Sequence, residues 1–198
     1  MQISVILAHP DRNSFNHAIA QSIVHEISEC KHEVFFHDLY AEKFNPLMSP
    51  EEIPSNVEIP PELDVYCREI SHCDGIVIVH PNWWGQPPAI LTGWVDRVFR
   101  PGIAYRFIEG DKGEGVPIGL LKAKFGLVIN TSNTSDEREE NIFGDPLQLI
   151  WKNCIFDLCG VKNVTREVFN IVVDSSNEQR EEWLLRSRTL IRQCVECE

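Results

Sequence analysis

The chain has 198 residues, of which 43% are hydrophobic and 24% are charged, and its formal net charge is −12. This length and composition predict a globular protein with one domain spanning residues 1–198. Nucleic acids and anionic membrane surfaces are themselves negatively charged. The negative net charge of the chain therefore argues against a protein that binds nucleic acids or such membranes in general.

The cellular compartment is predicted from the apolar runs and the cysteines. Residues 3–8 form too short an apolar run, and lack the basic start, for a secretory signal. No apolar run approaches the ~18 residues needed to span a bilayer. The seven cysteines are scattered, and Cys154 and Cys159 lie in apolar stretches. We therefore expect reduced thiols in a cytoplasmic protein without a membrane span.

Strand and helix patterns alternate along the chain. Short apolar runs predict strands, and apolar residues at helical spacing predict helices. In chain order we expect strand 2–8, helix 14–30, strand 33–37, loop 41–61, helix 62–72, strand 75–80, helix 87–99, loop 100–120, strand 125–130, helix 145–159, strand 164–170 and helix 177–194. Five apolar strands separated by helices predict a doubly wound parallel α/β sheet with helices on both faces. Such a sheet binds ligands beyond the carboxyl ends of its strands.

The loop after the first strand leads directly into a helix. Helix N-termini present free N–H groups and partial positive charge. Asn13 and Ser14 are good N-caps, and no Glu or Gln follows at the spacing of a capping box. The loop, residues 9–16, therefore suits one phosphate monoester, with an ordinary capped helix as the alternative. It is neither a G-x-G-x-x-G nor a P-loop, which argues against a Rossmann dinucleotide site or an ATPase.

The loop after the third strand carries two adjacent tryptophans. Trp83 and Trp84 can flank a planar ligand there, because neighbouring Pro, Gly and Asn residues fix the backbone. The alternative is that both pack under the following helix. Within that helix we expect Trp94 in the core, and Asp96 and Arg97 as solvated residues or a weak ion pair.

Two further clusters are predicted to have no site chemistry. The acidic segment 136–140 is expected to be solvated surface. Cys194 and Cys197 form a single C-x-x-C near the C-terminus, and one pair cannot complete a four-ligand zinc site. The histidines show no metal-ligand spacing. We therefore predict no metal site.

Several ordered segments resemble those of the short flavodoxin-like NAD(P)H:quinone oxidoreductases. The segments are 7–10, 14–16, 38–40, 44–46, 81–84, 88–99, 104–105 and 144–145, and together they cover roughly residues 3–160. The resemblance implies a flavodoxin-like sheet with strand order 2-1-3-4-5. It also implies a homodimer with the active site at the subunit interface.

The resemblance implies bound FMN, with FAD as the alternative, and it assigns residues to three parts of the site. Those matching the phosphate site are His9, Asn13, Ser14, Phe15 and Asn16. The residues that match the first wall of the isoalloxazine pocket are Pro81, Asn82, Trp83 and Trp84. The residues that match its second wall are Thr131, Ser132, Asn133 and Thr134. The resemblance gives catalytic roles beside the substrate to Trp84, Tyr105 and Phe107. Of these, Tyr105 and Phe107 would reach in from the partner chain.

The implied activity is hydride transfer from NAD(P)H through the flavin to a quinone-like acceptor, in a ping-pong cycle. The alternatives are an azo- or nitro-reductase, a flavin-binding regulatory subunit of an ion-efflux system, and a one-electron carrier. Two departures from the family pattern bear on the substrate range. Asn133 and Thr134 replace a Gly pair. Phe143 stands where larger members carry a His that relays a proton with a Tyr, and no such Tyr is found nearby.

Overall fold

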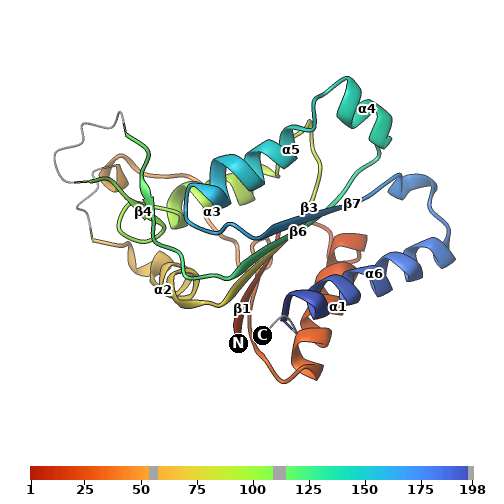
Figure 1. The fold of residues 1–198 in the computed structure, drawn as a ribbon, viewed down its shortest axis with the longest axis horizontal. Helices are drawn as coiled ribbons and strands as arrows, with labels where there is room; N and C mark the ends of the chain where they lie inside the picture. Colours follow the sequence, from red (N-terminus) through yellow and green to blue (C-terminus); the bar gives the residue numbers. More distant parts are fainter. Residues whose placement is uncertain (54–57, 109–114, 196–198) are drawn as a thin grey trace.

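The computed structural model describes residues 1–53, 58–108 and 115–195. Within these residues, a five-stranded parallel sheet forms the centre of the molecule (Figure 1). Its strands, in chain order, are β1 (Gln2–Leu7), β2 (Glu33–Asp38), β3 (Gly75–Pro81), β6 (Phe125–Thr131) and β7 (Val164–Phe169). They lie in the order β2-β1-β3-β6-β7, which is 2-1-3-4-5 when only this sheet is counted. The predicted sheet and strand order are therefore confirmed.

Helices cover both faces of the sheet, as predicted (Figure 1). On one face, α1 (Phe15–Glu29) packs beside α6 (Asn177–Val195). The other face is covered by α2 (Asp64–His72), α3 (Ala89–Val98) and one helical segment made of α5 (Pro146–Gln148) and the π-helical η3 (Leu149–Asp157).

The side chains of each central strand alternate between these two faces. In β3, Val77 and Val79 join the apolar cluster beneath α1 and α6, whereas Ile76 and Ile78 join the cluster beneath α2 and α3. β3 and β6 are buried at every position. Burial on both faces explains why their sequences are continuous apolar runs and not alternating ones.

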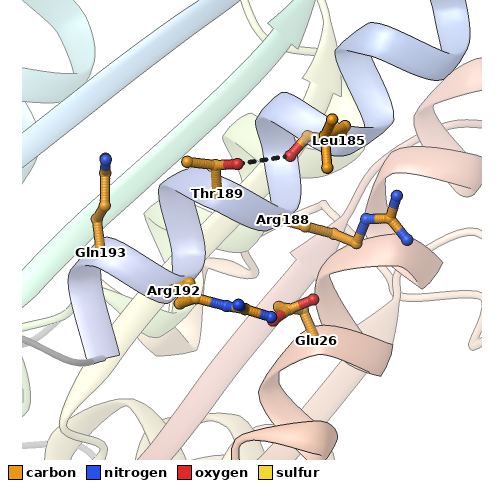
Figure 2. A pocket seen from close by; sticks show the side chains of 6 residues that line it. All are labelled: Glu26, Leu185, Arg188, Thr189, Arg192 and Gln193. Atoms are coloured by element: carbon orange, nitrogen blue, oxygen red, sulfur yellow. Dashed lines mark hydrogen bonds and ion pairs between the residues drawn. The ribbon is translucent and has the colours of Figure 1, made fainter.

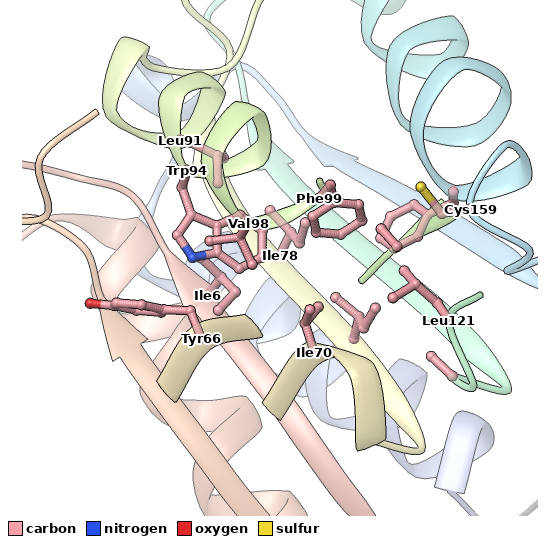
Figure 3. Packing of buried hydrophobic residues seen from close by; sticks show 14 of the residues in the cluster. Ile6, Tyr66, Ile70, Ile78, Leu91, Trp94, Val98, Phe99, Leu121 and Cys159 are labelled. Atoms are coloured by element: carbon pink, nitrogen blue, oxygen red, sulfur yellow. The ribbon is translucent and has the colours of Figure 1, made fainter. Parts of the chain in front are cut away.

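The core between the sheet and α3 contains the predicted tryptophan (Figure 3). Trp94 is 1% exposed, and its ring meets Phe99 in a T-shaped contact at 5.4 Å between centroids. The opposite side of α3 lies against the segment before residue 53. A Cβ on Gly93 would stand 2.3 Å from the carbonyl oxygen of Pro46, so glycine allows this close approach.

The prediction that Arg97 is solvated or weakly paired is wrong. Its side chain is 3% exposed, and Nε and Nη2 donate to the two carboxylate oxygens of Glu52 at 3.0 Å each. Nη1 donates to the carbonyl oxygen of Asn45 at 2.7 Å, and Nη2 also reaches Glu62 at 3.1 Å. A buried ion pair persists only when its donors and acceptors are satisfied in this way. The cluster fixes α3 to η1 (Pro50–Glu52), a short 3-10 helix within a segment predicted as loop.

Further elements lie in segments predicted as loops. α4 (Asp136–Asn141) begins after Ser135, whose hydroxyl accepts a hydrogen bond from the Arg138 N–H. β4 (Tyr105–Arg106) and β5 (Ile118–Gly119) form a two-stranded antiparallel sheet. The short 3-10 helices η2 (Pro61–Leu63) and η4 (Val172–Asp174) complete the described elements.

None of the helices in the described part of the chain is long and apolar enough to cross a membrane. Among the same residues, no group of three or more His, Cys, Asp or Glu side chains is placed to hold a metal ion. Cys197, the second member of the C-x-x-C pair, lies outside the described residues.

Candidate functional site

The loops that follow β1, β3 and β6 are joined by hydrogen bonds. Asn16 Nδ2 donates to Thr131 Oγ1 at 2.9 Å, and the Asn82 N–H donates to the Thr131 carbonyl oxygen at 2.7 Å. The ring of His9 stands 6.2 Å from that of Trp83. The structure therefore brings together residues that the sequence placed in three separate loops.

Ser14 caps α1, and its hydroxyl is engaged by His17. Ser14 Oγ accepts from the His17 N–H at 3.4 Å and lies 3.0 Å from His17 Nδ1. His17 Nε2 lies 3.0 Å from Oδ2 of Asp38, at the end of β2. Helix geometry leaves the N–H groups of Phe15 and Asn16 without intrahelical acceptors. These two amides are the donors that a phosphate would meet.

Two predicted phosphate residues have other surroundings for their side chains. The Phe15 ring packs against Phe169 and Trp183, at 6.4 and 5.8 Å between centroids, so its backbone N–H is the part open to a ligand. Asn13 is exposed, and its N–H donates to Asp11 Oδ1 at 2.9 Å. A role for Phe15 through its ring is therefore not supported.

Asn16 supplies a test of whether the loop fits a ligand. It is 3% exposed, and its Oδ1 has no hydrogen-bond partner. A half-turn of the amide would let the Thr131 hydroxyl donate to the oxygen and would leave the amide nitrogen as an unpaired donor. In that flipped orientation, the unpaired amide nitrogen of Asn16 beside the free helix amides fits an anionic group. Burial lowers the pKa of His9 and the nearby His17 adds to the effect, against an opposing hydrogen bond with the Asp11 backbone.

Residues 83–86 form a tight turn in the second loop. Trp83 and Gln86 exchange backbone hydrogen bonds at 3.0 Å, and Asn82 Oδ1 accepts from the Gly85 N–H at 2.9 Å. Trp84 and Gly85 have φ values of 60° and 73°, the pattern of a type I′ turn. Glycine adopts this conformation freely, but a tryptophan there is strained. Trp84 is 99% exposed, so the alternative that it packs under α3 is wrong.

The third loop is fixed against the end of β7. The Ser132 N–H donates to the Phe169 carbonyl oxygen at 2.9 Å, and Ser132 Oγ accepts from the Thr134 N–H at 3.0 Å. Asn133 Oδ1 accepts from the Val173 N–H at 3.0 Å. The Asn133 side chain and the backbone of Thr134 therefore help to hold the loop in place.

A cavity of about 970 Å³ opens between the second loop, the third loop and α4. Its size is at the upper end of the range for small-molecule and cofactor sites. The predicted residues that line it are Asn82, Trp84, Asn133 and Thr134.

Part of the remaining wall of this cavity comes from α4, which was not predicted from the sequence. Glu139 is 6% exposed and accepts a hydrogen bond from Asn82 Nδ2 at 3.1 Å, so the segment 136–140 is not simply solvated surface. Beside it, the Arg138 guanidinium lies over the Phe143 ring at 5.3 Å. Ser135 followed by acidic residues is an N-terminal helix pattern that could have indicated α4.

Tyr105 and Phe107 are not among the residues that line this cavity in the same chain. Their rings form a T-shaped pair at 5.8 Å between centroids, on and just after β4. Phe107 is 42% exposed. Their contribution to a partner's site stays a prediction.

A buried polar network lies under the second and third loops. His80, fully buried at the end of β3, accepts from Trp151 Nε1 at Nε2 (2.9 Å) and places Nδ1 2.8 Å from the Pro81 carbonyl oxygen. Burial lowers the pKa of His80 to about 4, and Arg166 acts in the same direction. Arg166 donates to the Asn130 side chain and to Asp145 at 2.8 Å each, which ties β6 and β7 to the start of α5.

Another cavity, of about 480 Å³, lies between α1 and α6 (Figure 2). Its walls include Arg188, and Arg192 paired with Glu26. Glu26 is near the end of α1, which runs back toward the amino ends of the strands. Ligands of doubly wound sheets bind at the opposite edge. We therefore assign the site to the cavity beside Trp84.

Comparison with known proteins agrees with this fold. A sequence model of the family described by its flavodoxin-like fold matches residues 1–190. An uncharacterised NAD(P)H oxidoreductase of Haemophilus influenzae is 37% identical over 169 residues, covering 83% of this chain and 81% of the relative. NAD(P)H dehydrogenase (quinone) 1 of Cavia porcellus is 30% identical over 167 residues, covering 74% of this chain and 59% of the relative. The structure of an NAD(P)H:quinone oxidoreductase from Methanothermobacter marburgensis matches with a TM-score of 0.85 at 26% identity, covering 100% of this chain and 98% of the other. The chain therefore belongs to the flavodoxin-like family that includes the NAD(P)H oxidoreductases and quinone reductases.

Proposed function

We propose that the protein is an FMN-dependent NAD(P)H oxidoreductase that delivers hydride to quinone-like acceptors. The observation that carries the proposal is the joining of three loops, which sets the free amides of α1 at the same sheet edge as a cavity of about 970 Å³. The names of the relatives, an NAD(P)H oxidoreductase and an NAD(P)H:quinone oxidoreductase, support the same pair of substrates.

The phosphate of FMN is assigned to the N-terminus of α1. The N–H groups of Phe15 and Asn16 would donate to it, and helix N-termini favour anions through their partial positive charge. The hydroxyl of Ser14 and the amide of Asn16 complete the donor set. We prefer FMN to FAD because this loop is suited to one terminal phosphate.

The isoalloxazine ring is assigned to the cavity between the second and third loops. Within the described residues, the N–H groups of Trp84 and Asn133 donate to no protein acceptor. Fixed backbone donors of this kind stabilise negative charge where it develops. The rigid turn at 83–86 and the anchored loop at 131–134 hold them in place, so little reorganisation accompanies the reaction.

When bound, FMN would supply the redox chemistry for hydride transfer from NAD(P)H to the acceptor. The protein binds and orients the reactants and excludes water. Trp84, standing at the mouth of the cavity, would cover the stacked nicotinamide or quinone. No side chain is required as a nucleophile.

We further propose that the active form is a homodimer. Trp84 exposes its whole indole, and an adjoining hollow of about 410 Å³ is bordered by Pro87, Val95 and Ile155. Exposed apolar surface of this kind is typical of interfaces. The partner subunit's Tyr105 and the partner subunit's Phe107 would then cover the site. Light scattering of the purified protein tests the dimer directly.

A cytoplasmic location is part of the proposal. Cys67, Cys73 and Cys159 are buried free thiols, and Cys154 is an exposed one. Unpaired thiols are typical of reducing compartments.

The test is a visible spectrum of the purified protein with FMN, followed by anaerobic NADPH and then a quinone. We expect bound flavin that bleaches fully with NADPH and regains its colour with the quinone. Bound flavin that NADPH does not reduce would favour an electron carrier or a regulatory subunit. Absence of flavin binding would refute the assignment of the three loops. A panel of quinones, azo dyes and nitroaromatics then ranks the acceptors by kcat/KM.

A further inference from the structure

We infer that binding of a phosphate monoester at the N-terminus of α1 is coupled to uptake of one proton by His17. The inference rests on the proposed function, because the phosphate is that of FMN. It makes His17 a positioning residue that sets the direction of the Ser14 hydroxyl hydrogen. Flavin affinity would accordingly depend on pH through a residue that need not touch the flavin.

The geometry fixes where the hydrogen atoms lie when His17 is neutral. His17 Nε2 is 3.0 Å from Asp38 Oδ2. A carboxylate offers only lone pairs, so Nε2 must carry the ring hydrogen. Nδ1 is then a bare acceptor, 3.0 Å from Ser14 Oγ. The single hydroxyl hydrogen of Ser14 therefore points to His17.

In this state Ser14 cannot help to bind an anion. Its oxygen already accepts from the His17 N–H at 3.4 Å, and its hydrogen is committed to the ring. The hydroxyl thus presents lone pairs to a phosphate at the helix N-terminus, which is repulsive. When His17 takes a proton from solvent at Nδ1, the ring donates to Ser14 Oγ. The hydroxyl hydrogen is then free to donate to the phosphate, and no covalent bond other than N–H is made.

The charges around His17 favour this change once a phosphate is bound. Asp38, from the end of β2, faces the ring, and the His17–Asp38 pair is largely buried at 8% and 13% side-chain exposure. From the β1–α1 loop, His9 stands edge-on at 6.3 Å between ring centroids, with Asp11 beside it. Burial and the charge of His17 both lower the pKa of His9, so the two rings are not expected to be charged together.

The inference is tested by calorimetric titration of FMN in phosphate-free buffers of different ionisation enthalpy, between pH 6.5 and 8.5. The free FMN phosphate titrates near pH ~6 and is a dianion over most of this range. We expect FMN binding to take up protons and FMN affinity to fall as the pH rises through this range. Riboflavin has the same ring without the phosphate, and its binding should take up no proton at this site.

Matched variants separate the role of His17 from general effects. His17→Gln should abolish the uptake and flatten the pH dependence of FMN affinity, while riboflavin affinity stays unchanged. His25→Gln, an exposed position on the same helix, should behave as wild type. Asp38→Asn keeps an acceptor for the Ala41 N–H, bonded to Oδ1 at 3.1 Å, but removes the charge facing His17, so it should reduce uptake at pH 7.5. Asp38→Asn also tests the inference if the His17→Gln protein does not fold.

Two results would overturn the inference while leaving the proposed function intact. In one, wild-type protein binds FMN with no more proton uptake than riboflavin. In the other, a folded His17→Gln protein takes up as many protons as wild type. If neither flavin binds to any folded variant, the proposed flavin site itself is refuted.

Discussion

His80 gives a prediction about stability that can be worked out from the structure. It is fully buried and hydrogen-bonded at both ring nitrogens. The indole N–H of Trp151 can only donate, so His80 Nε2 is unprotonated and Nδ1 donates to the Pro81 carbonyl oxygen. A second proton would have to enter at Nε2 against that indole N–H, away from solvent.

The sign and size of the pH effect follow from linkage. Burial lowers the pKa of His80 in the folded state to about 4 from an ordinary value of 6.5. Below pH 6.5 the unfolded chain therefore binds a proton that the folded chain does not. Stability is fully present above pH 6.5 and is lost as the pH falls toward 4. At pH 4.5 the loss amounts to about 2–3 kcal/mol.

The assay is urea denaturation of wild type and His80→Gln at pH 7.0 and pH 4.5. Glutamine keeps one acceptor and one donor but does not titrate, so the stability advantage of wild type should shrink by about 2–3 kcal/mol on acidification. Carboxylates that titrate in both proteins cancel in this comparison. His25→Gln should give no such change. If the advantage of wild type over His80→Gln is the same at both pH values, the buried neutral state of His80 is refuted.

Three other predictions follow from the site and the core. Trp84→Ala should lower kcat more than it weakens FMN binding if the indole covers the substrate as proposed; equal losses in steady-state turnover and in calorimetric affinity would contradict this role. Arg97→Met should lower the free energy of unfolding by about 3–5 kcal/mol because it leaves the Glu52 carboxylate buried and unpaired, and adding Glu52→Gln should recover part of it; additive losses in urea denaturation would contradict the pairing. Burial alone would lower the pKa of His37, but hydrogen bonds with two glutamate carboxylates raise it. The stability from this pairing is present below pH 6.5 and lost as the pH rises through the raised value, so the advantage of wild type over His37→Gln should be larger at pH 6 than at pH 9.

Local sequence patterns were sufficient to predict the sheet and the three loops. The buried strands are continuous apolar runs, and their order follows once the family is recognised. Each loop residue assigned to the flavin lies at a strand end or at most nine positions after one, where the fold brings separate loops to one edge. Such information is contained in short stretches of the chain.

What escaped prediction depends on partners far apart in sequence. Arg97 binds Glu52 across 45 positions, and its helix taken alone resembles one with a solvated charge. Glu139 meets Asn82 across 57 positions, so an acidic run that suggests plain surface contributes a buried wall of the cavity. The local sequence around a charged residue does not show whether its side chain will be exposed to solvent or buried in an ion pair. Burial depends on the whole fold.

Trp84 combines two features that stability alone does not explain. Its φ of 60° lies in the left-handed region, where a bulky residue costs roughly 1–3 kcal/mol. Its indole is 99% exposed, so packing within the chain does not offset that cost. The next residue in the turn, Gly85, has a φ of 73° in the same left-handed region, which glycine adopts without strain. A strained, unpacked tryptophan that lines the cavity therefore agrees with the proposal that Trp84 makes its contacts outside its own chain, with a planar substrate and a second subunit.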